Sequence, residues 1–577
     1  MLRFSRIGDA IAATTKKLEK TALVADYLCA VPTQEAAIAA IFLSGSPFAA
    51  YDEATLQVGG ALLWRVIGEL SGKSEQDLTE IYRKHGDAGS VAAEALPERT
   101  EHVLSLVEVQ QALSEIAAAR GPAAKAHLLR ELLRRATPLE AKYIVKIIGG
   151  DPRIGLKESL VEEAIARAFE VPLEQVKRAN MLLGDLGQTL RLASAGKLAE
   201  AHLRLFHPID FMLASPVASA EDALSYFENV AVEDKYDGIR GQAHISQGEV
   251  RIFSRTRDDI TESFPELPPA LAGLPLDAIL DGEIVAWTSC GAGIPAREEV
   301  GASTKMSRAL PFSTLQQRLG RKKVSHKTIR DIPVAYLVFD VLYAGGKLLL
   351  DRPLRERAQV LHDLLAAPRT TVVRQPAAQS TLAFEGPDDP SLAAVLRAPV
   401  ATATSTQDIE ALFSAARDRG NEGLMIKDLD ALYTPGRRGK SWLKMKRELA
   451  TLDVVVTAVE YGHGKRIGVL SDYTFAVWDG ERLVNIGKAY SGLTDAEIAE
   501  MTQWFLAHKV SEQGLRLEVE PKIVLEVAFN NMMRSTRHAS GYALRFPRIV
   551  RLRPDKRPED ADTIQTVRDI YERQHAS

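Results

Sequence analysis

The chain has 577 residues, of which 46% are hydrophobic and 26% are charged, and its formal net charge is −4 at pH 7. This length is several times that of a single domain of about 100–200 residues, and the composition is that of a globular protein rather than a disordered or membrane-spanning one. The weakly acidic balance excludes a uniformly basic nucleic-acid-binding chain, so any contact with DNA must come from local patches.

The first twenty residues are interrupted by charge and lack the apolar core of a secretory signal. No apolar run approaches the roughly 20 residues that cross a bilayer. The two cysteines, Cys29 and Cys290, are too few and too far apart for a disulfide framework or a four-cysteine zinc site. We therefore expect a cytoplasmic protein with no membrane role.

Residues 1–210 carry the pattern of helices. Apolar residues recur at the helical period over residues 128–133 and again over residues 160–169. Between these segments a glycine- and proline-containing turn precedes Arg153 and Lys157, close to the start of a helix, where a phosphate could bind. The pattern predicts an all-α domain.

The pattern of apolar residues changes after residue 210. Residues 211–447 mix strand-like runs, such as 338–343, with helical stretches, such as 355–365, and predict an α+β domain. Residues 448–577 contain short strand-like runs separated by glycine turns, which favour a small β-barrel. The sequence therefore predicts three domains, with a hinge near residue 447.

The most informative motif is Lys235-Tyr236-Asp237-Gly238-Ile239-Arg240, which follows a strand-like run. It resembles the K-x-D-G-x-R motif of the covalent nucleotidyltransferases, which include polynucleotide ligases and messenger-RNA capping enzymes. The resemblance implies that the Lys235 amine attacks the α-phosphate of ATP and carries AMP. Such an attack requires a neutral amine, whereas a free lysine has a pKa of about 10.4, so burial and neighbouring cations must favour the neutral form.

Alone, this hexapeptide is equally compatible with a solvated lysine before a turn. Further blocks occur in the family's order between Glu233 and Lys556, and they decide in favour of the resemblance. The resemblance implies a set of residues that bind ATP or AMP: Glu233, Arg240, Arg255, Glu283, Phe339, Arg438, Lys444 and Lys446. By pattern alone, Phe339 would be ordinary core packing and Arg255 a surface arginine.

Within this set the resemblance gives individual roles. Phe339 stacks on the purine, and Glu283 lies near the ribose and the metal. Glu422 joins Glu283 in binding Mg²⁺ or Mn²⁺, a hard cation that prefers carboxylate oxygens, while Lys427 lies near the nucleotide phosphate. Lys444 and Lys446 alternate along a strand and so share one face, where they would stabilise charge on the α-phosphate. The sixth motif orients pyrophosphate through Arg545, Arg548, Arg551, Asp555 and Lys556.

A helical domain before the core is typical of ATP-dependent DNA ligases of the archaeal, eukaryotic and some bacterial kinds, whose C-terminal barrel is an OB-fold. NAD-dependent ligases carry a four-cysteine zinc module, for which this chain lacks the cysteines. Residues 305–330 contain eight Lys or Arg and no acid, a patch suited to the DNA backbone. The predicted DNA contacts are Arg153, Lys157, Arg318, Arg321 and Lys322.

The resemblance thus implies an enzyme that seals nicks in duplex DNA through lysyl-AMP and DNA-adenylate and acts as a monomer. Two other functions are compatible with the sequence. An RNA ligase or capping-type enzyme would have to discriminate at the 2′-hydroxyl. A non-catalytic DNA clamp would have no use for Lys235, Glu283 and Glu422.

Overall fold

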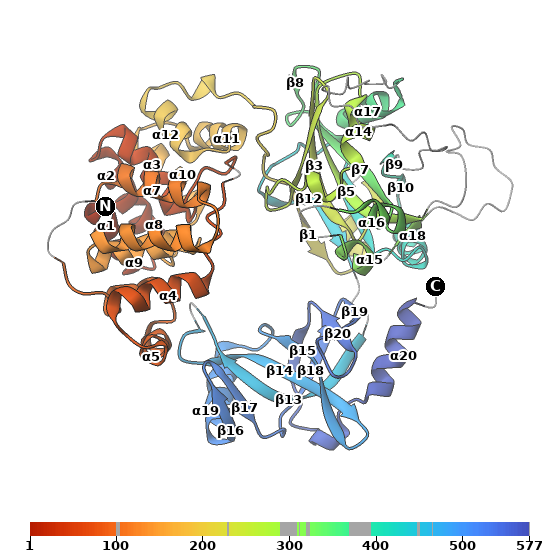
Figure 1. The fold of residues 1–577 in the computed structure, drawn as a ribbon. Coiled ribbons are helices and arrows are strands. Elements are labelled where there is room, and N and C mark those ends of the chain that lie inside the picture. The colour runs from red at the N-terminus through yellow and green to blue at the C-terminus, as the bar shows by residue number, and fades with distance from the viewer. Residues whose placement is uncertain are drawn as a thin grey trace, which may run out of the picture. The chain divides into compact units, whose positions relative to one another are not determined.

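A computed structural model of the chain describes residues 1–52, 54–99, 104–227, 230–288, 308–310, 312–318, 324–368, 394–446, 450–463 and 466–575 (Figure 1). The chain divides into two compact units. One unit comprises Met1–His202 together with Glu448–Ala576, and the other comprises Leu203–Arg447. In the described residues no helix is both long and apolar enough to cross a membrane.

The N-terminal part of the first unit is built from helices around an apolar core. Residues whose side chains accept from backbone N–H groups begin several of them: Ser105 and Thr137 each form a capping box with the glutamate three residues later. The helices predicted over 128–133 and 160–169 are confirmed by α8 and α10. The described helices of this part are α1 (Leu2–Ala12), α2 (Lys17–Cys29), α3 (Thr33–Ser44), α4 (Gly60–Ser71), α5 (Glu75–His85), α6 (Ala88–Ala95), α7 (Leu106–Ala118), α8 (Pro122–Arg135), α9 (Pro138–Ile148), α10 (Glu158–Ala168), α11 (Leu173–Leu183), α12 (Leu186–Ser194) and the 3-10 turn η1 (Leu198–Glu200).

The C-terminal part of the first unit is rich in strands, as predicted. Its main sheet has the order β15-β14-β13-β17-β16, and β18 bridges β13 to β21. β13 pairs with three strands because β14 lies along one of its edges, with irregular register, while β18 and then β17 pair with successive parts of the other edge. The elements are β13 (Ala450–Tyr461), β14 (Leu470–Asp479), β15 (Arg482–Ala489), α19 (Asp495–Ala507), β16 (Lys509–Gln513), β17 (Arg516–Val519), β18 (Val524–Phe529), β19 (Asn531–Arg534), β20 (Tyr542–Arg545), β21 (Arg548–Leu552), η4 (Pro558–Asp560) and α20 (Ile564–His575).

The second unit is the α+β part and contains two sheets, of orders β1-β12-β11-β2-β10 and β4-β3-β5-β7-β8, with β6 beside β5 and β9 beside β7. Its described strands are β1 (Leu213–Val217), β2 (Val230–Asp234), β3 (Ile239–Ser246), β4 (Glu249–Ser254), β5 (Ala278–Thr288), β6 (Arg308–Ala309), β7 (Val334–Ala344), β8 (Lys347–Leu348), β9 (Ala394–Arg397), β10 (Val400–Ala403), β11 (Leu424–Asp428) and β12 (Arg438–Met445). Its helical elements are α13 (Ala220–Leu224), η2 (Thr261–Ser263), α14 (Leu267–Ala272), α15 (Phe312–Gln316), α16 (His326–Asp331), α17 (Leu354–Ala366) and α18 (Thr406–Asp418).

Strand pairing in this unit brings the sequence motifs together. The first motif lies where β2 ends and β3 begins, so its residues connect the two sheets. Beyond the end of β2, Lys235 continues the pairing with the segment before β11, because its N–H donates to the Gly423 carbonyl and its carbonyl accepts from the Glu422 N–H. In the other sheet Arg240 lies opposite Glu283. Residues from three separate parts of the sequence, 235–240, 283 and 422–423, thereby acquire fixed relative positions.

The segment 203–210 belongs with the second unit rather than with the helices that precede it. The Phe206 N–H donates to Nδ1 of the buried His244, and the Ile209 N–H donates to Oε1 of the buried Gln242. These bonds connect the segment to β3, and the predicted boundary at residue 210 stays a prediction. Nothing in the sequence indicated what the buried polar side chains of Gln242 and His244 would bind. The division into three domains also remains a prediction.

A buried ion pair fixes α17 to β7 in the second unit. Arg357 donates from Nε and Nη2 to the two carboxylate oxygens of Asp340, at 2.8 and 2.9 Å, and both side chains are fully buried. The Arg357 guanidinium also donates to the carbonyls of Arg352 and Ala431. Each buried polar atom of this pair therefore makes a hydrogen bond that offsets the cost of its desolvation.

We predict that Arg357→Met lowers the free energy of unfolding by about 3–5 kcal/mol, because it leaves Asp340 as an uncompensated buried charge. Urea unfolding followed by tryptophan fluorescence measures the change. Arg352→Met is the matched control: its side chain is 63% exposed and its loss is expected to change stability by no more than about 0.5 kcal/mol. A loss below 1 kcal/mol for Arg357→Met would contradict the prediction.

Candidate active site

The centre of the site is an ion-paired cluster of Lys235, Glu422 and Lys446. Nζ of Lys235 lies 2.6 Å from Oε2 of Glu422, and the Lys446 ammonium pairs with the same oxygen. Burial opposes ionisation of Glu422, but the two lysines outweigh it and hold the pKa of its carboxyl below the ordinary value. Burial and the nearby Lys235 lower the pKa of Lys446. Two ammonium groups thus share one carboxylate.

Glu283 lies close enough to this cluster to be coupled to it. Burial raises the pKa of Glu283 to about 7, and Glu422 and Asp281 add to the rise, whereas Lys235 and Arg240 oppose it. The carboxyl is therefore partly protonated near neutral pH. A carboxyl whose pKa is this high is a frequent feature of functional sites.

This pKa predicts how stability depends on pH. Since the folded pKa of about 7 exceeds the ordinary 4.5, the folded protein holds the Glu283 proton more tightly than the unfolded chain. The resulting stabilisation is fully present below pH 4.5 and is lost as the pH rises through 7. We expect the unfolding free energy of the wild type, relative to Glu283→Gln, to fall by roughly 2–3 kcal/mol between pH 5 and 8. Urea titrations in EDTA test this, and a difference that is flat or rises with pH would contradict it.

Two further cations, Arg438 and Lys444, lie on β12. Burial lowers the pKa of Lys444, and Arg438, Lys235 and Arg255 lower it further, so these four cations lie within electrostatic reach of one another. Lys444 is half-buried, whereas Arg438 and Arg255 are exposed. Four positive charges this close together suit a polyanion such as a triphosphate.

The ring of Phe339 is half-buried on β7 and forms a candidate stacking surface. Behind it the Lys427 ammonium lies 4.4 Å from the centroids of both Phe339 and Trp442 and 2.6 Å from Oε2 of Glu233. Burial raises the pKa of Glu233. The prediction that Lys427 lies at the nucleotide phosphate is wrong, because its side chain is only 1% exposed and is enclosed by these three partners.

Arg240 is held from several sides. It donates from Nε and Nη2 to the two oxygens of Asp281, at 3.0 and 2.7 Å, and from Nη1 to the Met212 carbonyl. The Tyr433 hydroxyl donates to Asp281 as well and accepts from the Met212 N–H. Sequence reasoning missed Asp281 and Tyr433. A charged residue inside the apolar run 278–287 was the one available sign that Asp281 has a buried partner.

The donor set of the site suits a hard divalent cation. Glu283 and Glu422 raise the energy of each other's ionised form, and a dication between them would relieve that repulsion. Among the described residues no group of three or more His, Cys, Asp or Glu side chains could hold a metal ion. Mg²⁺ is commonly bound by one or two carboxylates, and phosphate and water oxygens supply its remaining ligands. Glu283 and Glu422 would suit such a site.

The predicted DNA contacts have different outcomes. Arg318 is fully buried and donates to both oxygens of Glu266 and to the Ile332 carbonyl, so the prediction that it contacts DNA is wrong. Its positive charge is neutralised by Glu266 inside the fold. Arg321 and Lys322 lie outside the described residues.

Arg153 and Lys157 lie in the loop that leads into α10. Arg153 adopts a left-handed backbone conformation with φ of 53° and donates from Nη1 to the Gly86 carbonyl. Its side chain is still 27% exposed, and Lys157, the residue before α10, is exposed. Both remain predicted contacts, on a loop whose geometry is fixed rather than free.

The residues of the predicted sixth motif belong to β20, β21 and the turns around them. Arg548, Arg551 and Asp555 are exposed, and Arg545 and Lys556 are partly exposed. Arg551 donates from Nε to Glu526 at 2.6 Å, and Lys556 pairs with Asp453 at 2.5 Å. Their contact with pyrophosphate remains a prediction.

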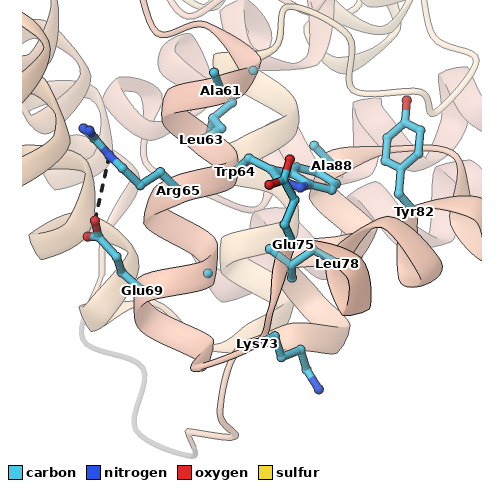
Figure 2. A pocket seen from close by; sticks show the side chains of 12 residues that line it. Ala61, Leu63, Trp64, Arg65, Glu69, Lys73, Glu75, Leu78, Tyr82 and Ala88 are labelled. Carbon is cyan, nitrogen blue, oxygen red and sulfur yellow. Dashed lines mark ion pairs between the residues drawn. The ribbon is translucent and has the colours of Figure 1, made fainter. Parts of the chain in front are cut away.

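A separate hollow lies on the helical part, between α4 and α5 (Figure 2). Trp64, Leu78 and Tyr82 contribute to its lining, and the Arg65–Glu69 ion pair lies at one side of it. None of its lining residues belongs to a predicted site.

Comparison with family models covers most of the chain. The model described as ATP dependent DNA ligase domain matches residues 211–446, the one described as DNA ligase N terminus matches residues 1–166, and the one described as ATP dependent DNA ligase C terminal region matches residues 466–556. The three matches follow the order of the all-α, α+β and strand-rich parts of the structure.

Curated relatives agree with these matches. The chain is 57% identical over 572 residues to "Probable DNA ligase" of Koribacter versatilis (strain Ellin345), covering 98% of this chain and 96% of that one. It is 36% identical over 588 residues to "DNA ligase" of Methanothrix thermoacetophila, covering 99% and 98%. A solved structure titled "Pmar-Lig_PreS3" shares the fold, with a TM-score of 0.59 and 16% identity over 95% of this chain and 99% of that one.

Proposed function

The chain belongs to the ATP-dependent DNA ligases, and we propose that Lys235 is the residue that carries AMP in its reaction. Enzymes of this family seal nicks in DNA by adenylation chemistry. The observation that supports Lys235 is its ion-paired cluster with Glu422 and Lys446, where an amine is surrounded by further cations beside a buried carboxylate. We propose that its substrate is nicked duplex DNA and that it acts as a monomer.

In the first step Nζ of Lys235 forms a bond to the α-phosphorus of ATP, and the bond from that phosphorus to the bridging oxygen breaks. Pyrophosphate leaves with the electron pair. Lys235 first loses one proton to solvent and becomes a neutral amine, and the second proton, released from nitrogen as the bond to phosphorus forms, passes to Glu422, the base 2.6 Å away. Lys444 and Lys446 stabilise the charge that develops on the α-phosphate oxygens.

In the second step the AMP moves from Lys235 to the 5′-phosphate of the nick, and in the third the 3′-hydroxyl displaces AMP and closes the strand. Phe339 would stack on the adenine throughout, with Arg240 held in place by Asp281. Glu283 and Glu422 would hold Mg²⁺ or Mn²⁺, which would neutralise phosphate charge when bound.

A sealing assay tests the assignment of donor and substrate. A 5′-labelled nicked duplex is incubated with Mg²⁺ and either ATP or NAD⁺, and a second duplex carries RNA on its 3′-hydroxyl strand. We expect sealing with ATP and none with NAD⁺, and faster sealing of the all-DNA nick. Preference for the RNA-containing nick would overturn the assignment to DNA and favour an RNA ligase.

A further inference from the structure

Two acidic side chains face each other on neighbouring strands of the C-terminal part. Asp453 on β13 and Glu526 on β18 are register partners, and their side chains are only 13% and 16% exposed. Like charges directly opposite each other in a sheet are destabilising unless cations lie between them. The position therefore requires counter-ions.

The counter-ions come from the end of β21 and the turn after it. Arg553 donates from Nη1 to both oxygens of Asp453, at 2.9 and 3.2 Å, and Nζ of Lys556 lies 2.5 Å from Oδ2 of the same carboxylate. Glu526 accepts from Nε of Arg551 at 2.6 Å. The two acids thus hold Arg551 and Lys556 of the predicted sixth motif, together with Arg553, in one place.

Asp453 is itself fixed by its backbone. Its N–H donates to Oδ2 of Asp562, and its carbonyl accepts from the Asp562 N–H, both at 2.8 Å. An acceptor held in this way can orient the flexible side chain of Lys556, which would otherwise lose considerable rotamer freedom on binding an anion. The Lys556 side chain remains 32% exposed, and an ammonium has three donors, of which Asp453 occupies one direction.

From this geometry we propose that Asp453 is a positioning residue for the adenylation step: it orients Lys556 toward the β- and γ-phosphates of ATP, while Arg553 beside it is held by Asp453 and Asp555. The inference rests on the proposed role of the sixth motif. It assigns to a residue of β13, outside that motif, the preorganisation of the lysine that meets the leaving pyrophosphate. The role concerns ATP alone, because a nick that already carries AMP has no pyrophosphate to release.

The test compares Asp453→Asn, Lys556→Ala, the double variant and the wild type in two reactions. The first is single-turnover transfer of label from α-labelled ATP to the protein over a range of ATP concentrations. The second is closure of a pre-adenylated nick without ATP. Asp479→Asn is the matched control, because Asp479 pairs with Arg482 on an exposed hairpin of the same sheet.

We expect Asp453→Asn to lower the rate of adenylation at subsaturating ATP by about tenfold or more, with closure of the pre-adenylated nick within twofold of wild type. The double variant should be no slower than Lys556→Ala, because both changes remove one interaction. Asp479→Asn should match the wild type in both reactions.

Three results would overturn the inference. If Asp453→Asn slows both reactions equally, Asp453 is a structural residue. If Asp453→Asn adenylates at the wild-type rate while Lys556→Ala is slow, the inference is refuted but the role proposed for Lys556 is not. If Lys556→Ala adenylates normally, the role proposed for Lys556 fails and the inference falls with it.

Discussion

Lys235→Ala is expected to lower the transfer of label from α-labelled ATP to the protein by at least about 10⁴-fold, because it removes the nucleophile while leaving the phosphate-binding cations in place. The measurement is a single-turnover assay with Mg²⁺. Lys347→Ala, which removes an exposed lysine on β8 of the same unit, is the control and should label like the wild type.

A second substrate separates loss of the nucleophile from loss of the fold. Closure of a pre-adenylated nick needs no lysyl-AMP, so Lys235→Ala should still close it, at a reduced rate. Labelled Lys235→Ala protein would mean that another residue carries AMP. Failure in both reactions together with a lowered melting temperature would trace the defect to folding instead.

Glu422→Gln is expected to slow adenylation by about 10²–10³-fold. The substitution keeps the shape of the side chain but removes the charge that pairs with both Lys235 and Lys446 and that is proposed to accept the proton. The rate of label incorporation at saturating ATP measures the effect. Glu356→Gln, at an exposed position on α17, should have no effect. A loss smaller than tenfold would remove Glu422 from the proposed proton transfer.

The elements that sequence patterns predict well are those determined by local periodicity. The apolar residues of α8 and α10 recur at the helical period, and the run that became β7 is interrupted only by Asp340 and is rich in β-branched and aromatic residues. The order of an all-α, an α+β and a strand-rich part followed from these local signals and is confirmed.

Pairings between distant residues were the part that could not be predicted. Arg318 lies in a basic segment, and no local pattern could place the carboxylate of Glu266 against it from 52 residues away. The same holds for Lys427, whose partner Glu233 is 194 residues distant. In both cases a cation predicted to face phosphate is instead neutralised inside the fold, since a buried charge must find a counter-charge.

The proposed active-site cluster combines residues that the sequence predicted with pairings that it did not. The hexapeptide identified Lys235, but only the continued pairing beyond β2 and β11 shows how Glu422 reaches it. The role of Tyr433 could not be predicted from the sequence, because no local pattern indicates the hydrogen-bond partner of a tyrosine in a loop. Its hydroxyl turns out to complete the partners of Asp281 and so to stabilise Arg240.

The measurement that tests the central proposal most directly is peptide mass spectrometry of the protein after incubation with ATP and Mg²⁺, followed by a chase with nicked duplex DNA. The proposal predicts a single AMP adduct on Lys235 that disappears during the chase as the nick is sealed. An adduct on any other residue, or one on Lys235 that nicked DNA does not discharge, would contradict it.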